Sequence, residues 1–368
     1  MIYTDIREIG ALKSRLEVIF EIKVMGAYFV ARSPRRLYFY ERETLKEVSQ
    51  VEIPVDNSFG SKELMTINDL CYTPVFSKKD SNFPSEGEHK HAELHAYSKD
   101  GLMWRYHLEG WSTGFNAGGV FVVNNTIVVG VKLGDKKSLV FLDSTTGKET
   151  RRVDGIDIDK TGGSILSPTT NFSKNSQIGF RGFESELYTV IEFSVNEFIP
   201  TELPGDQIQT VSLAKDHFLL YHIEERQYSK LSKFMYTDVS KREVYSLDFE
   251  FRAYRTTVNQ TGNLVVFLDK DDCSFHCFNT ESESVIWKWK SECDRYPAHF
   301  IFDRNNNLIV LDGDWGSDQS LVIIDGKSGE VIQQLQDTLG FTNDGYPFLI
   351  DDRIIVAKEG KLMALSNS

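Results

Sequence analysis

The stretch SLVFLDSTTGKETRRV (Ser138–Val153) reads as a hydrophobic strand, a polar turn and a second strand. Its turn holds Asp143 and Gly147, residue types that tight hairpins favour. The pattern recurs as RRLYFYERETLKEV from Arg35, ELHAYSKDGLMWRY from Glu93, ELYTVIEFSVNEF from Glu186, SKFMYTDVSKREVYSL from Ser232, CSFHCFNTESESVIWKW from Cys273, SLVIIDGKSGEVIQQL from Ser320 and the half-copy KLMALSNS from Lys361. Such a repeated unit cannot bury its apolar face alone and has to stack on its neighbours.

The spacing of the copies predicts the architecture. Their first large apolar residues lie 57, 45, 48, 47, 41, 46 and 41 residues apart: Leu37, Leu94, Leu139, Leu187, Phe234, Phe275, Leu321 and Leu362. Four-stranded blades of a β-propeller need about 40–50 residues each. We therefore predict an all-β fold, an eight-bladed β-propeller. The long first gap contains SKKDSNFPSEGEHKH (77–91), which we interpret as a loop insertion within the second blade.

The two ends of the chain are expected to complete one blade together. The last copy stops at Ser368 without an outer strand, and IYTDIREI (Ile2–Ile9) has no blade of its own, because RLEVIFEIK (Arg15–Lys23) already supplies the first inner strand. A strand from the N-terminal segment would close the last blade and cover its edge. The competing interpretation is a helix, since Ile6, Ile9, Leu12 and Leu16 fall near helical spacing, but Gly10 weakens it.

Composition favours one large domain, 1–368. Hydrophobic residues make up 40% of the chain and aromatic residues 12%, and no Pro/Gly/Ser-rich linker divides it. The start MIYTDIREIG does not resemble a signal peptide, and no run reaches the length of a membrane span. We expect a cytoplasmic protein that does not contact a membrane. Cys71, Cys273, Cys277 and Cys293 show no metal-type spacing, and we interpret them as reduced thiols, with Cys273 and Cys277 on one predicted strand.

The net charge of −13 disfavours a nucleic-acid binder, which needs a basic surface. An acidic chain can attract a protein partner that is basic at the contact surface. We expect such a partner for a chain that is monomeric by itself.

Two of the turns carry a family resemblance. LDSTTGKETR (Leu142–Arg151) and IDGKSGEVIQ (Ile324–Gln333) resemble the repeat of pyrroloquinoline-quinone-type propellers, Leu-Asp-x-x-Thr-Gly-Lys-x-x-Trp. Trp287 and Trp104 stand at the Trp position in two other copies. The resemblance implies that the Asp and the Gly shape each turn and that the Trp packs between neighbouring blades.

That family includes quinone-dependent dehydrogenases and non-enzymatic scaffolds such as outer-membrane assembly factors. Its enzymes bind calcium and the quinone over the central funnel and carry a disulfide between adjacent cysteines there. This chain has no adjacent cysteines and no residues onto which the cofactor ligands can be carried. The resemblance therefore implies the non-enzymatic branch, without a cofactor.

Two stretches offer metal-ligating residue types. In EGEHKHAELH (Glu86–His95), the side chains of His91, Glu93 and His95 would share one face of a strand, with His89 nearby. Imidazole and carboxylate groups can ligate zinc, but a solvated strand edge gives the same pattern. In DRNNNLIVLDGD, Asp303, Asn305, Asn307 and Asp314 imitate a calcium loop, although Leu308 replaces the required Gly. We favour a solvated edge and a tight Asn-rich turn, and predict no metal at either.

Acidic loops follow two predicted second strands. The first holds Asp269, Asp271 and Asp272, and the second is GDWGSD (Gly313–Asp318). Asp271, Asp272, Asp314, Trp315 and Asp318 are our candidate partner-binding residues, with Trp315 either an aromatic anchor inside an acidic rim or a side chain between blades.

No catalytic motif is present: the sequence has no G-x-S-x-G, Walker loop, H-E-x-x-H or dinucleotide fingerprint. We therefore expect a non-enzymatic scaffold or inhibitor of a protein partner. A bacterial immunity protein that neutralises a toxin is one protein of this kind, although no motif points to it. The alternative is an enzyme that acts on a sugar, lactone or quinone-type substrate in the central funnel.

Overall fold

Every regular element that the computed structural model describes is a β-strand. The described residues are 3–13, 17–54, 64–76, 92–109, 120–123, 126–133, 136–156, 177–181, 187–192, 197–202, 208–212, 217–224, 228–235, 238–249, 253–269, 271–291, 299–312, 320–335, 347–358 and 360–367. The predicted insertion, 77–91, lies outside them. The chain divides into two compact units, Phe20–Pro204 and Met1–Ile19 with Gly205–Ser368.

The unit Phe20–Pro204 consists of antiparallel sheets whose strands follow one another in chain order. Its strands are β2 (Glu21–Met25), β3 (Tyr28–Arg32), β4 (Arg36–Glu41) and β5 (Glu47–Glu52); β6 (Met65–Ile67), β7 (Leu70–Phe76), β8 (Ala92–Ser98) and β9 (Gly101–His107); β10 (Val120–Val123), β11 (Thr126–Leu133), β12 (Lys136–Asp143) and β13 (Glu149–Ile156); and β14 (Gln177–Arg181), β15 (Leu187–Glu192) and β16 (Glu197–Glu202). The first three sheets have four strands, and the described residues supply three to the last.

The other unit consists of four four-stranded sheets. Its strands are β17 (Ile208–Ser212), β18 (His217–Glu224), β19 (Tyr228–Met235) and β20 (Asp238–Phe249); β21 (Ala253–Val258), β22 (Leu264–Asp269), β23 (Ser274–Asn279) and β24 (Ser284–Lys290); β25 (His299–Phe302), β26 (Asn307–Asp312), β27 (Ser320–Asp325) and β28 (Val331–Leu335); and β1 (Tyr3–Ala11), β31 (Lys361–Asn367), β30 (Arg353–Lys358) and β29 (Phe348–Ile350). Seven of the predicted repeat copies supply the third strand of a four-stranded sheet, and the copy at Leu187 supplies β15, the middle one of the three described strands of its sheet. One boundary was wrong: the first inner strand is β2, which begins at Glu21 rather than at Arg15.

The Asp and the Gly of the repeat shape the turn, as the resemblance implies. The Oδ1 of Asp143 accepts hydrogen bonds from the N–H groups of Thr145 and Thr146, at 3.1 and 2.8 Å. Gly147 then takes a φ of +68°, a conformation that glycine adopts without a Cβ clash. Two copies keep this backbone without glycine, because Leu45 and Glu283 stand at the same turn position with φ of +60° and +54°.

Tryptophans from one sheet dock on the turn of the next sheet. Trp104 of β9 donates from Nε1 to the carbonyl oxygen of Ser144, 2.9 Å away in the β12–β13 turn. Its ring covers Gly147, where an added Cβ would lie 2.5 Å from the ring atom Cε3. In the other unit, Trp287 of β24 donates to the carbonyl oxygen of Gly326 at 2.8 Å, in the β27–β28 turn. The implied packing between neighbouring blades is therefore present at both positions.

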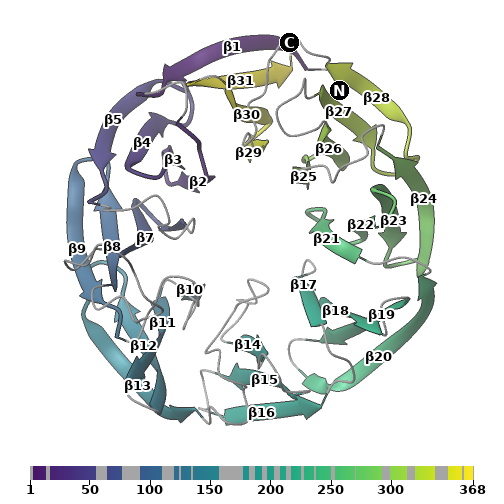
Figure 1. Cartoon of the computed structure of the whole chain (residues 1–368), viewed down its shortest axis with the longest axis horizontal. Helices are drawn as coiled ribbons and strands as arrows, with labels where there is room; N and C mark the ends of the chain where they lie inside the picture. The colour runs from purple at the N-terminus through teal and green to yellow at the C-terminus, as the bar shows by residue number, and fades with distance from the viewer. Residues whose placement is uncertain are drawn as a thin grey trace, which may run out of the picture. The chain divides into compact units, whose positions relative to one another are not determined.

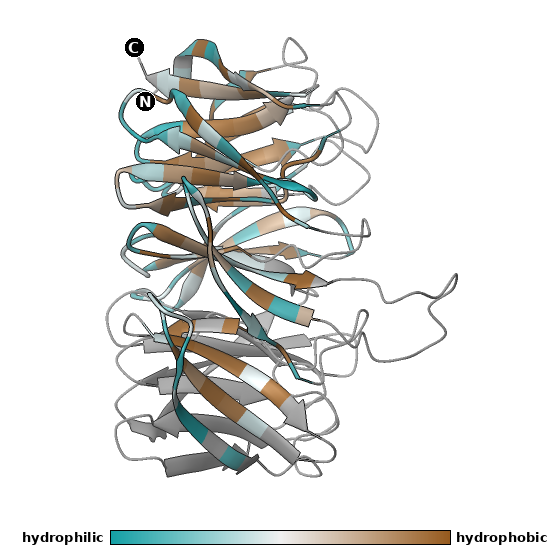
Figure 2. Ribbon diagram, turned by 90° about the vertical axis from the view of Figure 1, so that its left-hand side faces the viewer, coloured by the Kyte–Doolittle hydropathy of each residue, from teal (hydrophilic) through white to brown (hydrophobic). Residues whose placement is uncertain are grey.

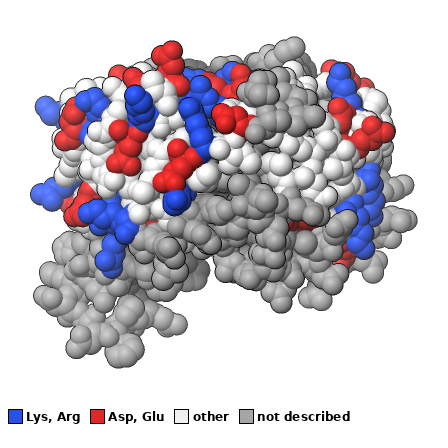
Figure 3. Space-filling view, turned by 90° about the horizontal axis from the view of Figure 1, so that it is seen from above, with Lys and Arg blue, Asp and Glu red and all other residues white. Residues whose placement is uncertain are grey.

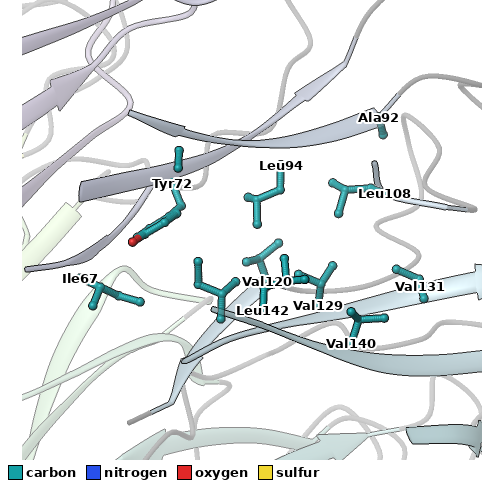
Figure 4. Close-up of a cluster of buried hydrophobic side chains, with 12 residues drawn as sticks. Ile67, Tyr72, Ala92, Leu94, Leu108, Val120, Val129, Val131, Val140 and Leu142 are labelled. Carbon is teal, nitrogen blue, oxygen red and sulfur yellow. The ribbon is translucent and has the colours of Figure 1, made fainter. Parts of the chain in front are cut away.

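The core lies between consecutive sheets. In one cluster, shown in Figure 4, Tyr72 and Leu94 from β7 and β8 face Val129 of β11 and Val140 of β12. Figure 2 shows that hydrophobic residues follow the strands and hydrophilic residues gather at many of the turns. In the described clusters, consecutive sheets thus bury apolar faces against each other, as a repeat of this kind requires.

The N-terminal segment is a strand, so the helical interpretation is wrong. β1 pairs antiparallel with β31, from Tyr3 opposite Asn367 to Ala11 opposite Lys361. Figure 1 shows this pair as a purple strand beside a yellow one. β1 covers the edge of β31, and the two ends of the chain share one sheet.

Gln333 of β28 holds the start of β1. Its Nε2 donates to the carbonyl oxygen of Tyr3, and its Oε1 accepts the N–H of Tyr3, both at 2.9 Å. The hydroxyl of the buried Tyr3 lies 3.3 Å from Oδ2 of Asp303 and donates to it. Side chains of the β25–β28 sheet therefore bind both the backbone and the side chain of Tyr3.

We expect Gln333→Ala to lower the free energy of unfolding by about 1–3 kcal/mol, because two hydrogen bonds to the Tyr3 backbone are lost. Gln334→Ala is the matched control, since Gln334 is the exposed neighbour on the same strand. Urea unfolding followed by tryptophan fluorescence measures both. Equal effects of the two substitutions would show that the side-chain contact with Tyr3 does not contribute.

Candidate functional site

The hairpin of β22 and β23 gathers polar side chains at its turn. β22 ends at Asp269, and β23 begins at Ser274. The Oδ1 of Asp269 accepts the N–H of Asp271 at 2.8 Å. The Oδ1 of Asp272 accepts the N–H of Ser274 at 2.9 Å and also its hydroxyl. Cys273 completes the turn with a φ of +58°.

His276 joins this group from β23. Alternate residues of a strand point to the same face, so Ser274 and His276 lie together. Their Oγ and Nε2 atoms are 2.9 Å apart, and the Oδ2 of Asp269 is 3.9 Å from the same Nε2. From β24, Lys288 donates to the Oδ2 of Asp272 at 3.1 Å. We call Asp269, Asp272 and His276 the turn cluster.

Burial and charge set the protonation of the turn cluster. Burial raises the pKa of Asp269, and the neighbouring carboxyl groups of Asp272 and Asp271 raise it further. Burial also acts to raise the pKa of Asp272, but hydrogen bonds from Ser274 and Lys288 outweigh it and hold that pKa below its usual range. Burial and the positive charge of Lys288 lower the pKa of His276 to about 4, so its imidazole is neutral at pH 7.

The turn cluster does not have the geometry of a hydrolase triad. In a triad, the serine hydroxyl faces one histidine nitrogen and the carboxylate binds the other. Here Ser274 and Asp269 face the same nitrogen, and the Ser274 hydroxyl donates to Asp272. Ser274 is also fully buried, so a substrate cannot reach it. What the cluster offers chemically is one ligand atom from each of its three members, all within 4.8 Å of one another.

The predicted partner-binding residues are only partly described. Asp271 is exposed at the tip of the turn, and Asp272 is half-buried and bound by Ser274 and Lys288. Asp314, Trp315 and Asp318 lie outside the described residues. The sequence prediction missed His276 and the inward position of Asp269. The available signal was the alternation of Ser274 and His276 directly after three acidic residues.

His95 is a buried structural histidine. Glu93 and His95 share one face of β8, as predicted, and the His95 ring contacts Glu93 and Tyr97 there. The interpretation as a solvated edge was wrong for His95, which is 3% exposed. Its Nδ1 is 2.9 Å from the Tyr97 hydroxyl, and its Nε2 is 2.9 Å from Oε2 of Glu93. Both ring nitrogens are therefore engaged in hydrogen bonds. His89 and His91 lie outside the described residues.

The Asp303 segment is the tight Asn-rich turn that we favoured. The Oδ1 of Asp303 accepts the N–H groups of Asn305 and Asn307, both at 2.8 Å. Its Oδ2 accepts the side-chain amide of Asn307 at 2.9 Å, and Asn306 takes a φ of +64°. The carboxylate is thus occupied by the turn itself and by the Tyr3 hydroxyl.

The described cysteines are buried, and none of them forms a disulfide: Cys71, Cys273 and Cys277. Burial raises the pKa of Cys277 to about 12, so it stays protonated at neutral pH. Our placement of Cys273 and Cys277 on one strand was wrong, because Cys273 lies in the turn before β23. Cys293 is outside the described residues.

Comparisons with known proteins identify the fold. No family model and no curated protein matches this chain. BamB from Moraxella catarrhalis is a structural neighbour with a TM-score of 0.58 and 12% identity, covering 99% of this chain and 98% of that one. The Dos1 propeller has a TM-score of 0.62 and 11% identity, over 99% and 95%. Kluyveromyces lactis Hsv2 has a TM-score of 0.54 and 12% identity, over 87% and 99%.

The fold is therefore a β-propeller similar to those of BamB and Dos1. At these identities the likeness concerns the fold alone. Within the residues that the structure describes, no helix is long and apolar enough to cross a membrane.

We expect Ser274 not to react with a fluorophosphonate probe at neutral pH. The reason is that Ser274 is buried and that its hydroxyl donates to the Asp272 carboxylate rather than to an imidazole. Labelling is measured by mass spectrometry of the intact chain and then of its peptides, with trypsin as the positive control. A phosphonylated Ser274 would contradict the structural role that we assign to it.

Proposed function

We propose that this chain is a protein-binding propeller without enzymatic activity, which acts as a scaffold or an inhibitor of one protein partner. The observation that carries the proposal is the β22–β23 turn, where the exposed carboxylate of Asp271 stands beside polar groups that bind one another. Such a turn presents charge to a partner but no free nucleophile. The shared fold of BamB, the Dos1 propeller and Hsv2 is consistent with a framework that presents loops.

We also propose that the eight sheets are the blades of one ring and that the N-terminal segment closes it. The pairing of β1 with β31 and the two hydrogen bonds between the Gln333 side chain and the Tyr3 backbone support this arrangement. A closed ring leaves no sheet edge open at the chain ends, which would keep the protein monomeric.

The proposed binding surface comprises the turns between the second and third strands of two consecutive sheets. One turn contains Asp271 and Asp272, and the other contains Asp314, Trp315 and Asp318. The inner strands β21 and β25 lie against each other, and both sheets have the same strand order, so the last residues of β22 and β26 lie at the same end of their sheets. On the face shown in Figure 3, acidic and basic side chains are mixed. Recognition would therefore depend on these local turns more than on one large acidic surface.

The net charge of −13 supports a partner that is basic at the contact surface. We propose that the complex forms in the cytoplasm and involves neither nucleic acid nor membrane. Neutralisation of a toxin by a bacterial immunity protein is one role that this design would serve. The alternative, turnover of a sugar, lactone or quinone-type substrate in the central funnel, would contradict a purely binding role.

We expect charge reversal at Asp271 to slow association with the partner and to weaken its dependence on salt, because an exposed charge mainly steers encounter. Trp315→Ala should weaken the complex by about 2 kcal/mol or more if Trp315 is a central anchor. The partner is first identified by co-purification from the native source. Binding rates are then measured at low and high salt, with Asp100→Lys, an exposed turn residue of the other unit, as the control. Unchanged association rates in folded variants would show that the interface lies elsewhere on the chain.

Ring closure is tested by deletion of residues 1–10, which removes most of β1. The exposed edge of β31 should promote aggregation and lower the melting temperature. Light scattering and thermal unfolding of the full and shortened chains measure the effect. A shortened chain that keeps its solubility and melting temperature would contradict closure by this segment.

A further inference from the structure

The buried carboxylate of Asp269 faces a second acid. Asp269 is 5% exposed, and its Oδ1 is bound by the N–H of Asp271. Its Oδ2 points to the turn cluster, where His276 Nε2 lies 3.9 Å away, beyond hydrogen-bond range. Asp272 is the other carboxyl group there. Two neighbouring carboxyl groups, of which one is buried, are stabilised by a shared proton or by a cation between them.

We propose that the turn cluster binds one divalent transition-metal ion through Asp269, Asp272 and His276, with Zn²⁺ as the reference ion. This site is independent of the protein-binding role proposed above. It lies on the inner side of the turn whose exposed tip carries Asp271.

The distances suit an ion after side-chain movements. Zn²⁺ binds imidazole nitrogen and carboxylate oxygen at about 2.0–2.2 Å in a tetrahedral arrangement, so its ligand atoms lie about 3.4 Å from one another. The three ligand atoms of the turn cluster lie within 4.8 Å of one another, and the pair from Asp269 and His276 is already 3.9 Å apart. Torsional changes of the two carboxylate side chains would bring these atoms together by the remaining distance, about 0.5–1.4 Å.

Ser274 contacts two of the proposed ligands. Its hydroxyl lies 2.9 Å from Nε2 of His276, so it has to turn away from that nitrogen when an ion binds there. Asp272 keeps its bonds from Ser274 at Oδ1, which fixes the direction of the carboxylate, and its second oxygen faces Lys288.

Lys288 is the competitor that an ion has to displace. Its ammonium group is 3.1 Å from Oδ2 of Asp272, and its side chain is half exposed. The Lys288 side chain can leave Asp272 for water at little cost in free energy, because an exposed ion pair contributes little. An ion bound by Asp269, Asp272 and His276 would have three protein ligands, whereas the ammonium group binds only Asp272. Removal of Lys288 should therefore strengthen metal binding.

The ligand set also selects the kind of metal. Ca²⁺ and Mg²⁺ prefer all-oxygen sites, whereas imidazole suits Zn²⁺ and its neighbours. Thiolate ligation is not available from Cys277, because its Sγ lies against the carbonyl oxygen of Gly326 in the β27–β28 turn. Two carboxylates and one imidazole leave room for water, which would complete the coordination.

The test is calorimetric titration of the full, metal-stripped chain with ZnCl₂ and, separately, with CaCl₂. We expect one Zn²⁺ per chain and no comparable binding of Ca²⁺. Asp269→Asn, which keeps the shape and the Oδ1 acceptor, should weaken Zn²⁺ binding by at least about tenfold. Lys288→Gln should strengthen it about fivefold, because a neighbouring positive charge is removed.

Two controls separate this site from others. Asp271→Asn changes an exposed carboxyl group of the same turn, and a variant with both His89→Ala and His91→Ala removes the histidine-rich stretch; both should bind Zn²⁺ like the wild type. Binding that is lost in the double variant, or equally in Asp269→Asn and Asp271→Asn, would overturn the proposal, as would no saturable 1:1 binding by the wild type.

One measurement needs no destabilising variant. Mn²⁺ added to the isotope-labelled wild type should selectively broaden the NMR signals of the His276 ring, and His95 should stay sharp because both of its nitrogens are engaged. Loss of partner binding with normal Zn²⁺ binding would affect only the proposed function, and the reverse result would affect only the metal site.

Discussion

One hydrogen bond recurs between consecutive sheets and fixes how each sheet meets the next. It joins a side chain on the outer strand of one sheet to the backbone carbonyl oxygen of the first turn residue in the next sheet. Trp104 and Trp287 make it with Ser144 and Gly326. In the first sheet, Ser49 stands at the Trp position, and its hydroxyl donates to the carbonyl oxygen of Lys99 at 2.6 Å. The bond therefore persists where the large ring is lost.

The Gln333–Tyr3 contact is the same arrangement adapted to the ends of the chain. Gln333 also stands at the Trp position, but in the β29–β31–β1 sheet the outer strand comes from the N-terminus, so no turn joins it to β31. There is no turn carbonyl to bind at this place. A glutamine carries both a donor and an acceptor, so it can hold the N–H and the carbonyl group of Tyr3 together. The departure of Gln333 from the repeat pattern thus has a physical cause.

The sequence was sufficient for what depends on local pattern. The repeated apolar runs predicted one strand in each of the eight sheets, and the Asp and Gly positions predicted the turns. The turn cluster was not predictable in the same way, because Asp269 and His276 meet through the pairing register of β22 and β23, in which Leu268 lies opposite Phe275. The first inner strand was misplaced because Ile19 is apolar and fully buried although it precedes β2. Burial alone does not mark the start of a strand.

In the β22–β23 turn, two aspartates only two positions apart, Asp269 and Asp271, have different chemical roles. Asp269 points inward, where burial makes its charge costly unless a cation or a proton shares it. Asp271 binds Asp269 through its backbone N–H and so leaves its own carboxylate exposed. The backbone of one residue thus orders the buried site, and its side chain carries charge to the surface. A ligand on the inner side would therefore contact the turn without using the side chain that faces a partner.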